Sequence, residues 1–479
     1  MAGRRTFIIG GGCTAFIKPR GQRTTEDMGL EAATKALLDA GVTYDDVKIA
    51  YVGYCYGDST SGQRALYNLG LTHIPIVNVN NNCSTGSAAL YQANNAVKYG
   101  QVECSLALGF ERMKPGSLGT NFPDRPQPTA LIGQRSIEME ADLGENHGPG
   151  APRMFDNGAQ EYFVKYGGDV NTLAKIASKN HKHSLNNPYS QFRDGWSEEQ
   201  VLNATKITRN LTKFMCSPTS DGAAACIVAS EDFVHKHGLE NQAIEIVAQA
   251  LTTDGSTTFE GRSAMDVVGY AMSKQCADQV FADAGFAPGE GRDMVGVVEL
   301  HDCFAANELI TYAALGLCEQ DEAHKMVERG DNTYGGKYVV NPSGGLEAKG
   351  HPLGATGLGM HFYIMMQLRN CAFNPVAIFY FNFVIDTGVS LGAGPMQAPG
   401  LFDIPDKRGK YGLIHNVGLG GAVVVSLLRR PEFYKEGGKD GRDRVGYNHA
   451  HECRPVTFAD VDKVKSKTAS QYLLERAKL

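Results

Sequence analysis

The sequence contains no apolar run long enough to cross a membrane and no cysteine spacing typical of a disulfide framework or a zinc site. Its most apolar stretch, residues 375–389, is interrupted by Asn382 and Asp386. The 11 cysteines are scattered through 479 residues and never form a Cys-x-x-Cys pair. We therefore expect no integral membrane segment, no bound metal and a reducing compartment.

A strong excess of charge of one sign is also missing. The chain has 46 basic and 52 acidic residues, which gives a formal net charge of −6. Nucleic-acid-binding domains usually carry a basic patch or stripe, so we expect no nucleic-acid partner. The length exceeds what one ordinary hydrophobic core supports, and it predicts two or three domains.

What the sequence does contain is a cysteine at a junction between a strand and a helix. The apolar residues 74–79 predict a strand, residues 88–97 predict a helix, and Cys83 lies between them. Free N–H groups at a helix N-terminus favour negative charge, so we expect the Cys83 thiol to ionise readily and to act as a nucleophile. A single cysteine in this setting could equally be a buried structural residue. The interpretation therefore depends on three further motifs.

A second strand, turn and helix follow the same plan in the other half of the chain. Residues 294–300 predict a buried strand, His-Asp-Cys-Phe occupies 301–304, and a helical pattern follows. This repetition suggests two similar α/β halves that face each other across one site. His301 could donate a hydrogen bond to a developing oxyanion, and Cys303 could give or take a proton. The alternative is a capping aspartate beside a core cysteine.

Two glycine-rich segments complete the set. In residues 341–357 the glycines predict a loop with no helix, and His351 stands between a glycine and a proline, so that its ring can be aimed at a cysteine as an activating base. In residues 415–421 a glycine-rich turn that includes Gly420 precedes a buried strand. Its exposed N–H groups could complete an oxyanion hole. Either segment alone could be an ordinary loop.

Taken together and in this order, these motifs resemble those of the thiolase superfamily, and most closely the sterol-carrier-protein-type (peroxisomal) 3-ketoacyl-CoA thiolases. The matching stretches are Asn-x-Asn-Asn-Asn-Cys-Ser-Thr-Gly-Ser at 78–87, His-Asp-Cys-Phe at 301–304 and Gly-His-Pro-Leu-Gly-Ala-Thr-Gly at 350–357. The resemblance implies an α/β thiolase fold, in which two similar βαβαβαββ halves stack as α-β-α-β-α layers with an inserted loop domain.

The resemblance also implies a division of the chain. The expected parts are an N-terminal half at residues 1–112 that resumes at 213–242, a loop domain at 113–212, a C-terminal half at 243–430 with an unusual insertion at about 374–408, and a tail at 431–479. The loop domain should cover the active site and bind CoA. The tail is too short for the sterol-carrier domain of the animal relatives, so we expect no sterol transfer.

Each motif residue receives a role from the resemblance. Cys83 is expected to take the acyl group, and His351 is expected to lower the pKa of its thiol. Most thiolases place their acid/base cysteine in a Cys-x-Gly turn, but this chain has Gly418 there, so Cys303 takes the part. His301 should line one oxyanion hole, and the N–H groups of Cys83 and Gly420 should form the second. Contacts with substrate are expected from Asn82, Lys182, His183, Ser343 and Gly344.

The implied activity is CoA-dependent cleavage of a 3-oxoacyl-CoA to acetyl-CoA or propionyl-CoA and a shortened acyl-CoA, in β-oxidation of fatty acids or sterol side chains. Coenzyme A is then a co-substrate, and no cofactor is bound permanently. The alternatives are acetoacetyl-CoA synthesis from two acetyl-CoA, a decarboxylating ketoacyl synthase, and a non-catalytic protein that binds acyl-CoA or lipid. Cys303 argues against the synthase, and the filled motif positions argue against a non-catalytic protein.

The last three residues and the family suggest further partners. Ala477-Lys478-Leu479 resembles the Ser-Lys-Leu type of peroxisomal address, which predicts a peroxisome or glycosome and recognition by an import receptor. A mitochondrial location is the alternative. The family implies a homodimer.

Overall fold

The structure of the protein is a computed structural model. It describes residues 3–114, 122, 124–373, 411–435, 449 and 453–471. The insertion expected at residues 374–408 and the tripeptide Ala477-Lys478-Leu479 both lie outside these described residues.

Within the described part of the chain, ten strands are joined in one sheet with the order β3-β2-β4-β5-β1-β6-β10-β9-β7-β8. The strands are β1 (Thr6–Cys13), β2 (Ala50–Gly53), β3 (Ile76–Val79), β4 (Cys104–Glu111), β5 (Gly222–Ser230), β6 (Ile244–Thr252), β7 (Val295–Glu299), β8 (Val339–Val340), β9 (Tyr411–Gly418) and β10 (Ala422–Arg429). The long strands β1, β4 and β5 are buried along their whole length.

The sheet consists of two five-stranded halves with the same internal plan. Reading outward from the middle, each half presents its first, fifth, fourth, second and third strand in that order. The second strand of each half pairs in parallel with the third and fourth, and the fifth strand is antiparallel to its neighbours. Among the described strands, the two halves of the sheet are joined by a short antiparallel pairing of β1 with β6, in which Phe7 is opposite Glu245 and Ile8 is opposite Ile244. The predicted repeat of two α/β halves is therefore confirmed.

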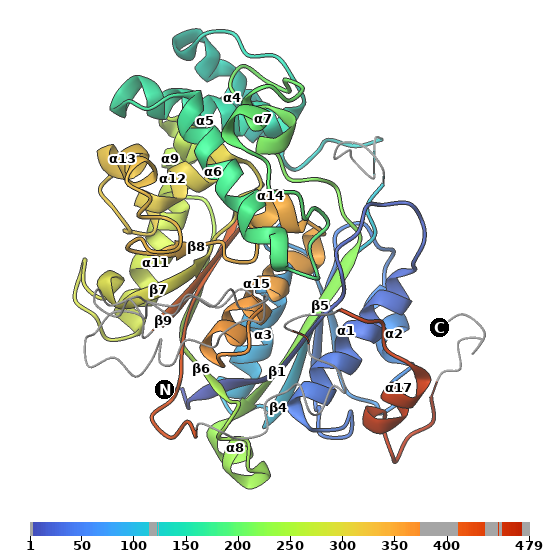
Figure 1. Ribbon diagram of the computed structural model, residues 1–479. Helices are drawn as coiled ribbons and strands as arrows, with labels where there is room; N and C mark the ends of the chain where they lie inside the picture. Colours follow the sequence, from blue (N-terminus) through green and yellow to red (C-terminus); the bar gives the residue numbers. More distant parts are fainter. Residues whose placement is uncertain are drawn as a thin grey trace, which may run out of the picture.

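Helices complete the predicted layers. The helix that follows the third strand in each half, α3 (Thr85–Lys98) or α15 (Leu353–Leu368), packs between the two halves of the sheet, and these two helices contact each other at the centre of the molecule (Figure 1). The outer layers are formed by α1 (Thr25–Ala40) on the first half and by α11 (Tyr270–Asp283) on the second. Every residue of α15 is buried, as expected for a helix enclosed on all sides. The fold is the predicted α-β-α-β-α arrangement.

Four helices lie between β4 and β5 in the chain, and they form the top of the molecule in Figure 1. They are α4 (Ala130–Leu143), α5 (Gly150–Tyr166), α6 (Val170–His183) and α7 (Glu198–Leu202). The remaining helices are α2 (Ser61–Leu66), α8 (Glu231–His237), α9 (Thr257–Glu260), α10 (Ala264–Val267), α12 (Ala305–Ala314), α13 (Ala323–Glu328), α14 (Gly345–Lys349) and α17 (Phe458–Val464).

One local prediction is wrong. Residues 341–357 were expected to contain no helix, but they include all of α14 and the first turn of α15. The glycines of α15 serve close packing instead of breaking the helix. A Cβ atom at Gly354 would clash with the carbonyl oxygens of Phe110 and Gly53, and one at Gly357 would clash with the hydroxyl of Ser87. Glycine at these positions lets α15 approach β4 and α3 closely.

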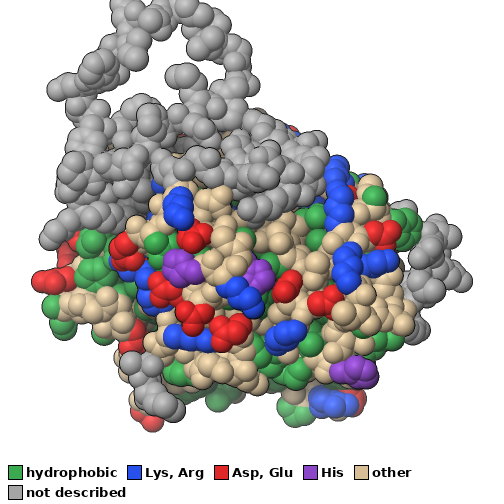
Figure 2. Space-filling view, turned by 90° about the horizontal axis from the view of Figure 1, so that it is seen from below, with side chains coloured by type: hydrophobic (Ala, Val, Ile, Leu, Met, Phe, Trp, Pro, Cys, Tyr) green, Lys and Arg blue, Asp and Glu red, His purple; other side chains and the backbone are tan. Residues whose placement is uncertain are grey.

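Among the helices that the structure describes, none is long and apolar enough to span a bilayer. On the face shown in Figure 2, acidic and basic side chains are interspersed, in keeping with the nearly balanced composition.

Candidate active site

Cys83 lies in the turn between β3 and α3, and its side chain is buried. The turn is held by Thr85, whose hydroxyl donates to the carbonyl of Asn82 (2.6 Å) and accepts from the N–H of Asn81 (2.8 Å). Asn82 adopts a left-handed backbone conformation with φ = 51°, which asparagine tolerates better than most residues. This turn places the thiol two residues before Thr85, the first residue of α3.

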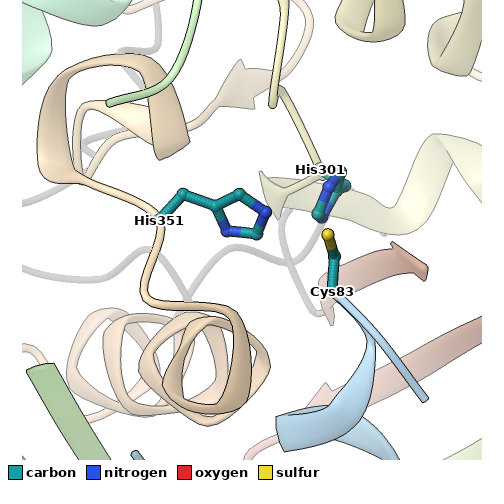
Figure 3. A group of neighbouring side chains, drawn as sticks. All are labelled: Cys83, His301 and His351. Atoms are coloured by element: carbon teal, nitrogen blue, oxygen red, sulfur yellow. The ribbon is translucent and has the colours of Figure 1, made fainter. Parts of the chain in front are cut away.

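Two histidines from the other half of the molecule converge on this thiol. The sulfur of Cys83 and one ring nitrogen each of His301 and His351 lie within 4.8 Å of one another. The two imidazole rings stand almost perpendicular, with their centroids 5.0 Å apart. Figure 3 shows the ring of His351 pointing toward His301 and Cys83, with the sulfur below His301. The structure therefore brings together three of the residues that the sequence motifs singled out.

The hydrogen bonds of His351 define its protonation. Its Nδ1 lies 2.7 Å from the hydroxyl of Thr356, and this hydroxyl donates its only hydrogen to the carbonyl of Pro352 (3.0 Å). Nδ1 must therefore carry the proton, and Nε2 has a free lone pair. Nε2 is buried and has no hydrogen-bond partner among the described residues. Burial and the nearby Lys349 lower the pKa of His351 to about 3, so the ring is neutral and presents a basic nitrogen to the site.

His301 has the opposite arrangement. Its Nδ1 lies 2.9 Å from the side-chain nitrogen of Asn416, and the same amide group donates to the carbonyl of Cys83 (3.1 Å). An amide nitrogen can only donate, so Nδ1 of His301 accepts and Nε2 carries the proton. Burial and the neighbouring rings of His351 and His415 hold the pKa of His301 well below its usual range. His301 is thus a neutral hydrogen-bond donor.

The Cys83 thiol does not ionise readily, contrary to the expectation from its place before a helix. Burial raises its pKa to about 12, and the carboxylate of Glu111 adds to the shift. The N–H groups of Cys83 and Leu419 act in the opposite direction but are outweighed. His351 is neutral and so supplies no charge that would lower this pKa. The site at rest therefore holds a thiol and a neutral base.

Cys303 belongs to the same region. It is buried beyond the end of β7, and its carbonyl accepts a hydrogen bond from the N–H of Ser217 (2.9 Å). Burial raises the pKa of its thiol well above the ordinary value, and the nearby Cys83 raises it further. The two thiols therefore interact electrostatically, although Cys303 is not part of the tighter group formed by Cys83, His301 and His351.

A cavity of about 1520 Å³ is lined by His351 and by Asn82 and Phe304, the chain neighbours of Cys83 and Cys303. Part of its wall comes from the two halves of the molecule and consists of Asn82, His351, Phe304 and Leu419. Residues between β4 and β5 line the opposite side; they include Gln127, Pro128, Thr129, Ala130, Gly133, Pro149, Gly150, Ala151, Pro152, Met154, His181, Trp196, Ile207 and Phe214. Three of the four helices at the top of Figure 1, α4, α5 and α6, thus contribute residues to the cavity wall.

The charged side chains of this cavity differ from those that the sequence suggested. Of the five residues expected to contact substrate, only Asn82 is among the described residues that line it. Lys182 is exposed on α6, whereas the ring of His183 is buried and bonded to the carbonyl of Asn341 (3.0 Å) and the hydroxyl of Thr333 (2.8 Å).

Ser343 and Gly344 also lie elsewhere. Ser343 is buried and bonded through its N–H and hydroxyl to the carboxylate of Glu299, and Gly344 packs against Ser184. Instead, the cations that line the cavity are Lys18, Arg20 and Lys213, all exposed. None of these three residues belongs to a sequence motif.

Glu347 is a buried acidic residue that none of the sequence motifs indicated. It lines the cavity, yet its side chain is buried and neither carboxyl oxygen has a partner among the described residues. Burial raises its pKa well above the ordinary value, and the nearby Asp302 and Glu308 raise it further. Both effects favour the neutral form of this carboxyl group.

Comparisons with known proteins match both halves of the chain. The model of the thiolase N-terminal domain matches residues 6–232, and the model named thiolase C-terminal domain-like matches residues 254–389. Sterol carrier protein 2 of Rattus norvegicus is 48% identical over 89% of this chain and 72% of its own length. Non-specific lipid-transfer protein-like 2 of Caenorhabditis elegans is 42% identical over 89% of this chain and 96% of its own length.

Solved structures with low identity share the fold. The Ltp2-ChsH2(DUF35) aldolase aligns with a TM-score of 0.67 and 20% identity, covering 89% of this chain and 98% of its own. Human mitochondrial 3-ketoacyl-CoA thiolase in complex with CoA aligns with a TM-score of 0.60 and 18% identity over the same shares of the two chains. From the family models and the relatives together, the chain belongs to the thiolase family.

Proposed function

We propose that this protein is a 3-oxoacyl-CoA thiolase that works through an acyl-enzyme on Cys83. The observation that supports the proposal is the pair of histidines around this thiol. His351 has a free Nε2 lone pair and His301 carries its proton on Nε2, and one ring nitrogen of each histidine lies within 4.8 Å of the sulfur. A thiol, a base and a separate oxyanion donor are the groups that acyl transfer to sulfur requires.

In the first half-reaction, Nε2 of His351 takes the proton of Cys83 as the sulfur attacks the 3-carbonyl carbon of the substrate. A thiol with a raised pKa suits this concerted transfer, because it stays neutral until substrate and base are both in place. The Cα–Cβ bond then breaks, which leaves the shortened acyl group on Cys83 and a thioester enolate. The Nε2–H of His301 stabilises the enolate oxygen, and the thiol of Cys303 protonates the enolate carbon.

The second half-reaction returns every group to its starting state. The Cys303 thiolate takes the proton of free CoA, and the CoA sulfur attacks the acyl group on Cys83. The N–H groups of Cys83 and Gly420 hold the oxyanion in this step. When the new thioester leaves, the Cys83 thiolate recovers its proton from His351. The products are acetyl-CoA, or propionyl-CoA from a 2-methyl substrate, and the shortened acyl-CoA.

Coenzyme A enters this scheme as a co-substrate bound under the segment expected at residues 113–212. Three exposed cations, Lys18, Arg20 and Lys213, line the cavity and suit the phosphates of CoA. In this proposal they replace Lys182 and His183, which the sequence suggested as substrate contacts. A protein of the same fold has been solved in complex with CoA, which supports CoA as the co-substrate.

A homodimer is part of the proposal. Strand β3 is at one end of the sheet and leads directly to Cys83, and Val77 on it is 43% exposed. An open strand edge invites pairing, and a second copy of the chain would cover it. Val77→Lys should give a monomer in analytical ultracentrifugation. A dimer of unchanged stability in that variant would place the contact elsewhere.

The direct test of the function is thiolysis of a panel of 3-oxoacyl-CoA esters. We expect CoA-dependent cleavage by the wild-type protein, with a chain-length profile that favours esters longer than acetoacetyl-CoA. Activity confined to acetoacetyl-CoA would favour the synthetic reaction from two acetyl-CoA. Binding of acyl-CoA without turnover would identify a non-catalytic member of the family.

A further inference from the structure

We propose that Asn416 is a positioning residue that keeps the proton of His301 on Nε2 and so makes this ring a hydrogen-bond donor toward the reacting oxygen. The catalytic consequence rests on the proposed function. The assignment of the proton rests on the geometry of Asn416 alone and can be tested without any substrate.

Asn416 lies on β9 and is fully buried, and its side-chain amide connects two parts of the site. One hydrogen goes to the carbonyl of Cys83 (3.1 Å) and the other to Nδ1 of His301 (2.9 Å). The nucleophile and the oxyanion donor are therefore held by a single group that is 333 positions from one and 115 from the other.

The orientation of this amide is fixed by its surroundings. Turned the other way, the amide oxygen of Asn416 would face the carbonyl oxygen of Cys83, and two acceptors would repel each other. In the observed orientation Oδ1 is buried without a hydrogen-bond partner. Such a group costs roughly 1–3 kcal/mol, so the two donated bonds must outweigh this cost. The amide oxygen of Asn416 is thus left without a hydrogen bond, and both hydrogens of the amide nitrogen donate within the site.

The tautomer matters because the two histidines have opposite tasks. Thr356 accepts from Nδ1–H of His351 and leaves its Nε2 free to take a proton. Asn416 donates to Nδ1 of His301 and leaves its Nε2 able to give a hydrogen bond. With the proton on Nδ1, His301 would present a lone pair to a negatively charged oxygen and would oppose the reaction.

The experiment is ¹⁵N NMR of the intact protein labelled at histidine, with the His301 signals assigned by comparison with His301→Gln. We expect protonated Nε2 in the wild-type protein. In Asn416→Asp, measured at pH 8, the ionised carboxylate can only accept, so the proton should move to Nδ1. The kcat of thiolysis should then fall about 10²-fold, as on loss of one oxyanion donor, with KM changed by less than about threefold.

Alkylation of Cys83 by iodoacetamide separates this role from a general structural one. It needs the base but no oxyanion donor, so Asn416→Leu, which removes the amide without placing a charge beside Cys83, should change its rate by less than about threefold. The matched control is Thr356→Val, which should slow alkylation and leave the His301 tautomer unchanged.

A proton on Nδ1 of His301 in the wild-type protein would overturn the proposal. Because that spectrum needs no variant and no turnover, it decides the question even if Asn416→Asp fails to fold. Retention of protonated Nε2 in Asn416→Asp would also overturn it. Absence of thiolysis in the wild-type protein would contradict the proposed function and leave the tautomer assignment standing.

Discussion

The carboxylate of Glu111 lies beside Cys83 and raises the pKa of its thiol. Glu111 is itself buried and accepts hydrogen bonds from the N–H groups of Cys55, Tyr56 and Gly354, each at 3.0 Å. Burial outweighs these bonds and raises the pKa of Glu111 to about 7. The charge beside the nucleophile therefore changes within the physiological pH range.

Glu111→Gln should make Cys83 more reactive above pH 7. In the wild-type protein Glu111 ionises as pH rises through about 7 and opposes ionisation of the thiol. Without that charge, alkylation of Cys83 at pH 8–9 should be about three- to tenfold faster, which corresponds to a fall of up to one unit in pKa. Iodoacetamide rates over pH 6–9 measure this. The same pH profile in both proteins would contradict the coupling.

Cys303→Ser should slow both half-reactions. A serine hydroxyl is a much weaker acid than a thiol, so it protonates the enolate and deprotonates CoA poorly. We expect kcat to fall by about 10²-fold or more, with no rapid burst of acetyl-CoA release in stopped-flow measurements. Cys216→Ser is the control, because Cys216 is a half-buried cysteine that lines the cavity, and this variant should retain the burst. A normal burst and normal turnover in Cys303→Ser would remove Cys303 from proton transfer.

Glu347→Gln should weaken the pH dependence of stability. The folded-state pKa of Glu347 is raised. Its contribution to stability is therefore complete below the ordinary glutamate pKa of about 4.3, and it is lost as pH rises toward the folded-state value. The free energy of unfolding should fall between pH 5 and pH 8 by about 1–3 kcal/mol more in the wild-type protein than in the variant.

Urea denaturation at several pH values provides this measurement. Glu145→Gln is the matched control, because the side chain of Glu145 is 89% exposed and should not affect the slope. Equal slopes for the wild-type protein and Glu347→Gln would show that Glu347 is ionised in the folded protein.

Lys213→Ala should weaken the use of CoA. Loss of one phosphate contact should raise KM for CoA about three- to tenfold with kcat nearly unchanged, because the contact is the same in ground and transition states. Added salt should reduce the difference between the two proteins. Lys182→Ala is the control, since Lys182 is exposed but does not line the cavity. A larger rise in KM for CoA in Lys182→Ala than in Lys213→Ala would instead support the contact by Lys182 that the sequence suggests.

The sequence predicted the parts of this molecule that depend on local pattern. Apolar strands followed by turns placed Cys83 and His301 correctly at the ends of β3 and β7, and the repeat of this unit predicted the two halves. The helices α4 and α14 were missed. In α14 and α15, glycines that allow close helix packing look the same in a sequence as glycines that break helices.

The rest of the site depends on contacts between distant segments. Asn416 reaches Cys83 across 333 positions, and nothing in the pattern around residue 416 indicates which hydrogen bond it makes. The pKa of Cys83 also depends on contacts that the local sequence pattern does not show. The helix N-terminus was visible in the sequence, but the burial that outweighs it was not.

The most direct test is intact-protein mass spectrometry after mixing the enzyme with a 3-oxoacyl-CoA in the absence of free CoA. The proposed mechanism predicts that the wild-type protein gains the mass of the shortened acyl group, that the adduct maps to Cys83, and that added CoA removes it. Cys83→Ala should gain nothing while it still binds CoA. No adduct on the wild-type protein during turnover, or an adduct that persists in Cys83→Ala, would contradict it.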